Sequence, residues 1–261
     1  MRLIYLFPLV ISLQLHAFED DDIDGVANSD DLCPDSSFED IVDERGCVED
    51  DSYWGKLSLS LGSDINIDDS TGVDYNFFAS YNYREWDFSI YSSQQTSYDT
   101  NNNASSSEGD LYLSMGYSFD IKKLSTKLTL GSKIATGSDD ISTGESDYFG
   151  NLTLNYLLNS QIALFSQLSY TQTGDSSDIE YRDPFGYSFG LGYMINSQWY
   201  SSLSYQVSES IYTQTDNYQA ISLFNSYNFS KDFFATLNYT RGLDDLSYDH
   251  TISLKLGVNF E

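Results

Sequence analysis

The chain is poor in basic residues, proline, cysteine and histidine, and these shortages limit the classes of protein to which it can belong. It carries 12 lysine and arginine residues against 40 aspartate and glutamate residues, a formal net charge of -28. Such a surface repels nucleic acid, whose binding requires clustered lysine and arginine, so no nucleic-acid partner is expected. Only 3 prolines occur, and 16% of the residues are aromatic. This mixture favours long strands with polar links and argues against disorder.

Long hydrophobic runs are also scarce, and the one clear run lies at the start. Arg2 precedes an apolar stretch from Leu3 to Leu13, which is followed by Leu15-His16-Ala17. The stretch is too short to cross a membrane as a helix. A basic start, an apolar centre and a small residue at the end are typical of a secretory signal peptide. We predict that residues 1–17 direct export, and a buried apolar strand is the alternative.

The two cysteines, Cys33 and Cys47, both precede the strand-rich part of the chain. In an exported chain, two cysteines this close together predict one disulfide. Closing a loop of that size stabilises a segment by about 3 kcal/mol in the chain-entropy model. The alternative, a metal site, lacks histidine or further cysteine partners nearby.

Alternation of apolar and polar residues fills residues 53–261. In the last segment one face of a strand carries Ile252, Leu254, Leu256, Val258 and Phe260, and the residues between them are mostly small or polar. Side chains alternate between the two faces of a strand, so this pattern predicts β-structure. It recurs about a dozen times without a helical period, which leaves two all-β architectures, a barrel or a sandwich.

The predicted strands number about twelve and are long. They cover 55–62, 72–83, 86–96, 109–120, 124–135, 147–158, 161–172, 184–195, 198–208, 217–229, 232–241 and 248–260. Tight turns alternate with longer polar links, of which the first, 63–71, contains Asp64. Long strands with short turns at one rim and long links at the other indicate a transmembrane antiparallel up-and-down β-barrel. A soluble, lectin-like sandwich is the alternative.

In such a barrel the short turns face the periplasm and the long links face the outside, which predicts the outer membrane of a Gram-negative cell. Both chain ends then lie on the periplasmic side. Aromatic residues at predicted strand ends, such as Trp86, Phe119 and Trp199, suit contact with lipid at the membrane interfaces. The end of the chain, Leu256-Gly257-Val258-Asn259-Phe260, resembles the signal read by the barrel-assembly machinery, with Glu261 following as a small departure. Outer-membrane lipid and that machinery are therefore expected partners.

The acidic segment 18–52 has an ordered spacing of oxygen ligands. Counted from Asp20, candidate ligands fall at positions 1, 3, 5, 7, 9 and 12, and Gly25 takes the sixth position, where a sharp turn is needed. This spacing predicts a calcium site, because calcium prefers six to eight oxygens. The candidate ligands are Asp20, Asp22, Asp24, the Val26 carbonyl, Asn28 and Asp31. A solvated acidic tail is the alternative.

The string from Asp20 through Cys33-Pro34-Asp35-Ser36 to Gly46-Cys47 resembles one thrombospondin type 3 repeat, in the version found in outer-membrane-protein-A-type proteins. The resemblance implies calcium binding and a periplasmic location. In that family the repeat links the barrel to a second domain. Here it precedes the strands.

Turning the apolar face to lipid leaves a small, polar lumen. Its candidate charged residues are Lys56, Asp74, Asp87, Lys127, Lys133 and Lys255. They suggest a narrow porin-like channel for small solutes with a weak preference for anions. The alternative is that the lysines pair with acids or extend to a rim.

Loose motifs in the C-terminal third, including Leu191-Gly192-Tyr193 and Arg241-Gly242-Leu243-Asp244-Asp245, resemble transporter-like barrels such as the phenol-degradation-pathway outer-membrane family. This resemblance implies passage of small solutes and transfers no binding residue. A non-conducting structural or adhesive anchor stays open as an alternative. An enzyme is not expected. A hydrolase would depend on His250, the one histidine beyond the predicted signal peptide, and the alternation of the last strand places His250 on the lipid-facing side with Ile252.

Overall fold

The structure is a computed structural model of the chain. It describes residues 26, 28, 30–33, 36, 42, 45–47, 55–68, 71–98, 104–138, 145–174, 181–212, 215–245 and 247–260. The chain divides into two compact units, Met1–Glu49 and Asp50–Glu261. No helix in the described ranges is long and apolar enough to cross a membrane.

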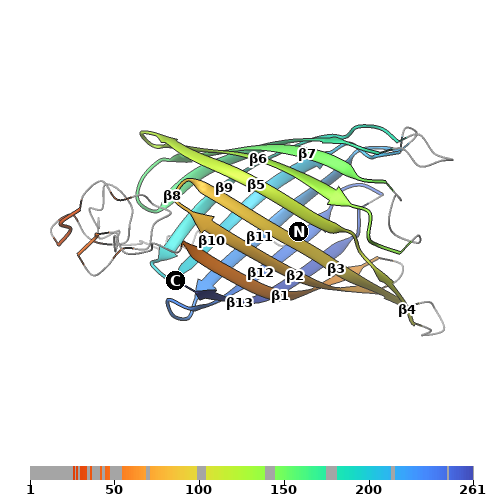
Figure 1. Cartoon of the computed structure of the whole chain (residues 1–261), viewed down its shortest axis with the longest axis horizontal. Coiled ribbons are helices and arrows are strands. Elements are labelled where there is room, and N and C mark those ends of the chain that lie inside the picture. The colour runs from red at the N-terminus through yellow and green to blue at the C-terminus, as the bar shows by residue number, and fades with distance from the viewer. Residues whose placement is uncertain are drawn as a thin grey trace, which may run out of the picture. The chain divides into compact units, whose positions relative to one another are not determined.

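The described part of the second unit forms thirteen strands and contains no helix. They are β1 (Lys56–Ile67), β2 (Thr71–Tyr83), β3 (Trp86–Tyr98), β4 (Ala104–Glu108), β5 (Leu111–Ile121), β6 (Leu124–Ile134), β7 (Asp147–Leu157), β8 (Ile162–Gln172), β9 (Phe185–Asn196), β10 (Trp199–Ser208), β11 (Tyr218–Asn228), β12 (Phe233–Gly242) and β13 (His250–Phe260) (Figure 1).

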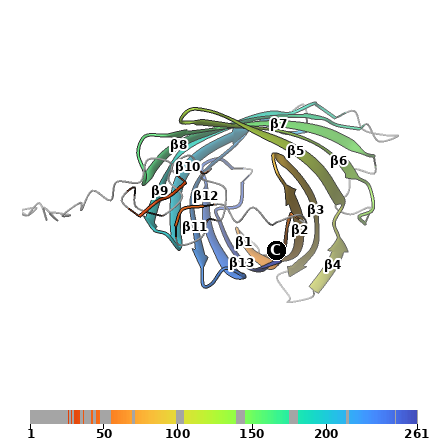
Figure 2. The same ribbon diagram turned by 60° about the vertical axis from the view of Figure 1, so that its left-hand side comes forward.

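Twelve of these strands close into an antiparallel barrel. Successive strands pair with one another, and β1 pairs with β13 from Leu57↔Phe260 to Ile67↔His250. Figure 2 looks into this ring, where β1 lies between β13 and β2 and the short strand β4 lies beside β3. The all-β, up-and-down barrel predicted from the alternation is confirmed.

Most links alternate in length as predicted. Links of two to four residues join β2 to β3, β5 to β6, β7 to β8, β9 to β10 and β11 to β12 at one end, the short-turn rim. The other end, the long-link rim, holds segments such as 135–146 and 173–184. The predicted link 63–71 is wrong, because β1 runs to Ile67 and β2 begins at Thr71. Ile65 and Ile67 continue the outward apolar series of β1, so Asp64 lies on a strand and not in a link.

The predicted strand 109–120 begins two residues later than expected, as β5, and the short strand β4, which was not predicted, precedes it in the chain. Gly109 and Asp110 separate β4 from β5, and both strands pair with β3 on the same side. The register shifts by one residue between Gln94↔Glu108 and Tyr91↔Tyr112, which is a β-bulge. The Gly109 N–H donates to the Ser93 carbonyl at 2.8 Å. One consequence is that the Asp110 side chain lies beside the inward Lys133.

The barrel exposes its apolar side chains on the outside. Leu61 is 67% exposed, Leu130 56% and Leu256 59%, while the buried hydrophobic residues of the described chain are two alanines. A soluble sandwich would bury these side chains between its sheets, whereas an outer-membrane barrel exposes them, so the sandwich alternative is wrong. Outward aromatic rings cluster at the short-turn rim, with 4.8 Å between the ring centroids of Trp86 and Tyr117. Aromatic rings at this level suit a membrane interface.

The first unit contains the predicted disulfide between Cys33 and Cys47, whose Cα atoms are 4.9 Å apart. The Leu32 N–H donates to the Arg45 carbonyl at 2.8 Å and so joins the two sides of the closed loop. The predicted signal peptide lies outside the described residues.

Candidate functional site in the barrel lumen

The strand register defines the inward face of the barrel. Cross-strand partners share a face, so Ser58, Asn259, Ser80 and Ser89 all lie opposite to the exposed apolar set. With twelve strands about 4.8 Å apart and tilted by about 40°, the backbone radius is about 12 Å. Most inward side chains are small and hydroxyl- or amide-bearing, and several bond to one another, as Ser89 does to Ser114 at 2.7 Å. Such a surface can hold water along the lumen.

All six charged candidates from the sequence occupy inward positions, and their partners differ. The Lys127 Nζ lies 2.7 Å from Asp87 Oδ1, and the Lys127 side chain is 38% exposed. Lys56 is the first residue of β1, at the short-turn rim. Asp74 faces Asp64 directly across the β1–β2 pair. The lumen therefore contains both neutralised and like-charged pairs.

Lys133 forms a buried ion cluster near the long-link rim. Its Nζ lies 2.7 Å from Asp147 Oδ2 and 3.7 Å from Asp110 Oδ2, and the Lys133 side chain is only 6% exposed. Asp110 Oδ1 also accepts hydrogen bonds from the N–H groups of Thr136 and Gly137, at 3.1 and 2.8 Å. Asp147 Oδ1 accepts one from the Gly174 N–H at 2.9 Å. The cluster thereby fixes two long links to the barrel wall.

Asp64 and Asp74 form an inward carboxylate pair. Asn66 Nδ2 donates to Asp74 Oδ2 at 2.8 Å, and Asn76 Nδ2 donates to Asp64 Oδ2 at 3.0 Å. One oxygen of each carboxylate is buried without a hydrogen-bond partner. Like charges directly opposite each other repel, so this pair contributes negative potential to the long-link half of the lumen.

Lys255 is the central lumen lysine. It lies opposite Gly62 on β1, and its Nζ is 5.9 Å from the ring centroid of Tyr91. Within the described residues no carboxylate oxygen lies within 4.0 Å of this Nζ. Its charge is thus not neutralised by an ion pair, unlike those of Lys127 and Lys133.

Four inward aromatic rings lie against glycines of the neighbouring strand. A methyl group built at any of these glycines would overlap the ring, so the rings occupy the space of missing side chains. The pairs are Phe149 on Gly131, Phe165 on Gly190, Tyr200 on Gly192 and Phe234 on Gly257. This packing holds these four rings against the wall of the barrel.

A strap across the long-link rim reaches from one wall to another. Within the β12–β13 link, Asp244 accepts hydrogen bonds from the Gln219 N–H of β11 at 2.5 Å and from the Ser247 N–H at 2.9 Å. Tyr248 hydrogen-bonds the inward Gln95 of β3. Burial raises the pKa of the Tyr248 hydroxyl, and the charges of Asp74 and Asp68 raise it further, against the effect of the Gln95 hydrogen bond. We call residues 243–245, 247 and 248 the strap.

Sequence reasoning did not identify Asp64, Asp110, Asp147 or the strap as parts of the lumen. Their positions depend on the extended β1, the bulge before β5 and contacts between distant segments. The sequence does indicate the aromatic residues of the lumen, because Phe149, Phe165 and Phe234 stand at positions of their strands that are otherwise mostly small or polar.

His250 faces outward beside Ile252, and its Nδ1 lies 2.8 Å from the Tyr239 hydroxyl. The described residues bring no serine or carboxylate into hydrogen-bond contact with this imidazole. A hydrolytic arrangement would need such contacts, so the geometry stands against the hydrolase alternative.

Of the six calcium-ligand candidates, Val26, Asn28 and Asp31 are described, while Asp20, Asp22 and Asp24 lie outside the described residues. Asp31 Oδ1 accepts the Cys33 N–H at 2.7 Å, and its Oδ2 is buried without a hydrogen-bond partner. An unsatisfied carboxylate oxygen is a suitable ligand for a hard cation, so this residue fits the predicted ion. The described residues alone contain no group of three or more metal-binding side chains.

The chain matches no family model and no curated protein significantly, but it resembles solved structures. The COG4313 outer membrane channel from Pseudomonas putida F1 superposes with a TM-score of 0.65 at 11% identity, covering 79% of this chain and 96% of that one. The NanC porin gives 0.56 at 11% identity, with 78% and 99% covered. The KdgM porin gives 0.54 at 10% identity, with 78% and 98% covered. These likenesses show the fold, which is that of an outer-membrane β-barrel.

Proposed function

We propose that the barrel is a water-filled channel through which small hydrophilic solutes cross the outer membrane. The observation that carries the proposal is the inward face itself, whose side chains are mostly small and polar and on which four large rings lie against glycines of the wall. A plugged structural anchor has no need to keep its rings against the wall. The solved barrels of similar fold are described as channels and porins, which adds support.

Planar-bilayer recording tests this proposal directly. The full-length protein, extracted in detergent and shown to migrate faster on gels before heating than after, is added to a bilayer. Discrete conductance steps are expected. A heat-modifiable, folded protein that inserts without conducting would overturn the channel and favour the anchor.

Lysines that line the lumen are proposed to set its selectivity. Lys127 and Lys133 are neutralised by acids, which leaves Lys255 as the main source of positive potential at mid-lumen. The Asp64–Asp74 pair opposes it near the long-link rim. Because charged side chains in a constriction set ion preference, Lys255 is the residue most able to favour anions.

We also propose that the short-turn rim faces the periplasm. Short turns at the periplasmic end and long links outside are the usual arrangement of bacterial barrels. β1 begins and β13 ends at this rim, so the segment before β1 would enter from the periplasm. The exposed C-terminal strand, with outward Leu254, Leu256 and Phe260, is the proposed contact for the barrel-assembly machinery. Protease added to intact cells should cut inserted tags in the link 135–146 and not in the turn 158–161.

A calcium site in residues 18–52 is the second proposal, supported by the ligand spacing and by the unsatisfied Asp31 carboxylate oxygen. Calorimetric titration of the full-length, disulfide-intact protein with calcium should release or absorb heat, and Asp22→Asn should remove the signal. Asp43→Asn, in the same acidic segment but outside the ligand set, is the control. Equal heats for both variants would identify nonspecific screening by acidic residues and overturn the site.

A further inference from the structure

One wall of the lumen is free of inward charge. Strands β8 to β12 contain a single charged residue, Arg241, which pairs with the outward His250 and Ile221 positions. All the charged lumen residues described above lie on β1–β3 and β5–β7, on β13 or in the bulge before β5. The lumen is therefore divided lengthwise into a charged wall and a neutral wall.

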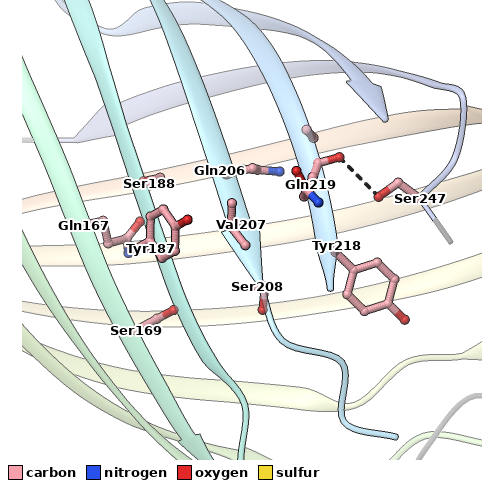
Figure 3. Close-up of a pocket in the computed structure, with 11 residues that line it drawn as sticks. Gln167, Ser169, Tyr187, Ser188, Gln206, Val207, Ser208, Tyr218, Gln219 and Ser247 are labelled. Atoms are coloured by element: carbon pink, nitrogen blue, oxygen red, sulfur yellow. Dashed lines mark hydrogen bonds between the residues drawn. The ribbon is translucent and has the colours of Figure 1, made fainter. Parts of the chain in front are cut away.

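The neutral wall is hollowed between two glutamines. Gln167 on β8, Ser188 on β9 and Gln206 on β10 lie in one row across the strands. The next row holds Ser169, Gly186 and Ser208. Because β9 has only Ser188 and Gly186 at the inward positions of these two rows, its surface lies lower than the glutamines on either side. A cavity of about 240 Å³ occupies this hollow, with Ser247 of the strap also lining it (Figure 3).

The polar groups of this cavity are available to a solute. Within the described residues, the amides of Gln167 and Gln206 make no hydrogen bond to protein, and neither does the Ser188 hydroxyl. The two glutamines stand two strands apart, about 10 Å at the backbone. Each amide offers one acceptor oxygen and two N–H donors, and each serine hydroxyl both donates and accepts.

We infer that this cavity binds a neutral, polyhydroxylated solute of the sugar class during passage. Neighbouring hydroxyl groups on a ring need donors and acceptors close together, which paired amides and hydroxyls supply. The cavity volume of about 240 Å³ is enough for one such ring. An anionic solute would find no cation on this wall to offset the loss of its hydration. The inference rests on the proposed channel function and names its solute class.

The test is saturation-transfer NMR on the full-length protein in detergent, which does not depend on conduction. The neutral probe is maltotriose, and the anionic comparison is trigalacturonate. Maltotriose should bind the wild-type barrel more tightly than trigalacturonate does. The double variant Gln167→Ala/Gln206→Ala should weaken maltotriose binding by roughly tenfold, the loss of one to two hydrogen bonds. Asn151→Ala, an inward amide on β7 outside the cavity, should leave it unchanged.

The outcomes separate this inference from the channel proposal. Equal maltotriose binding by wild type and the double variant, or tighter binding of trigalacturonate, would overturn the inference even if the barrel conducts. A barrel that binds maltotriose through the two glutamines but shows no conductance would overturn the channel and leave the binding site standing. Heat-modifiable migration of each variant establishes that it is folded.

Discussion

Replacing Lys133 by glutamine should destabilise the barrel far more than the same change at Lys127. Lys133 is 6% exposed and is the cation between Asp147 and Asp110, at 2.7 and 3.7 Å. Removing it leaves two buried carboxylates without their counter-charge, for which the cost is about 3 kcal/mol. Lys127 makes an equally short contact with Asp87, but its side chain is 38% exposed. Water screens that pair, so Lys127→Gln should cost less than about 1 kcal/mol.

Urea unfolding of both variants in detergent, followed by the folded and unfolded bands on unheated gels, measures the difference. Lys133→Arg, which keeps the charge, should recover part of the lost stability. Equal unfolding midpoints for the two glutamine variants would refute the argument, because burial would then have no bearing on the cost of the missing charge.

Three further predictions concern the lumen and the first unit. Lys255→Gln should lower the chloride-to-potassium permeability ratio, measured by reversal potentials in a salt gradient, because it removes the central lumen cation. Gly257→Ala should lower single-channel conductance by displacing the Phe234 ring into the lumen, and Phe234→Ala in the same chain should restore it. Reducing the Cys33–Cys47 disulfide should destabilise the first unit by about 3 kcal/mol, seen as faster proteolysis, and leave the barrel's unfolding midpoint unchanged.

Each of these three predictions would be contradicted by a specific result. An unchanged permeability ratio would mean that the Asp64–Asp74 pair dominates the field. Conductance that falls with Gly257→Ala and stays low in the double variant would point to a backbone change and not to the ring. A shift of the barrel midpoint on reduction would show that the two units do not unfold independently.

Much of the barrel could be predicted because a membrane strand shows its two faces in the sequence. The series from Ile252 to Phe260 is apolar at every second residue. A shift of the strand register by one residue would turn Lys255 toward lipid. This alternation also placed Lys127 and Lys255 on the inward side. The end of β1 was missed although Ile65 and Ile67 continue the series, because Ser63 and Asp64 are typical turn residues.

The missed parts depend on pairing between segments. β4 is a run of serine and alanine ending in Glu108, with no alternation, and it forms only because β3 extends past its pairing with β5 and pairs with it. The register decides which glycine receives which ring, so Phe234 on Gly257 could not be read from either strand alone. The contacts of the strap could likewise be predicted only if the positions of β11 and β3 on two different walls of the barrel were known.

The pairing of β1 with β13 has a consequence for how the chain assembles. Its partners are about 200 residues apart, as for Ser58 and Asn259, so the ring closes only when the last strand is available. Before that, β1 and β12 both carry unpaired backbone groups, each costing several kcal/mol in hydrocarbon. A chain shortened by β13 would thus carry two open edges and could not rest in a bilayer. Closure of the ring therefore depends on contacts of long sequence separation, which form slowly.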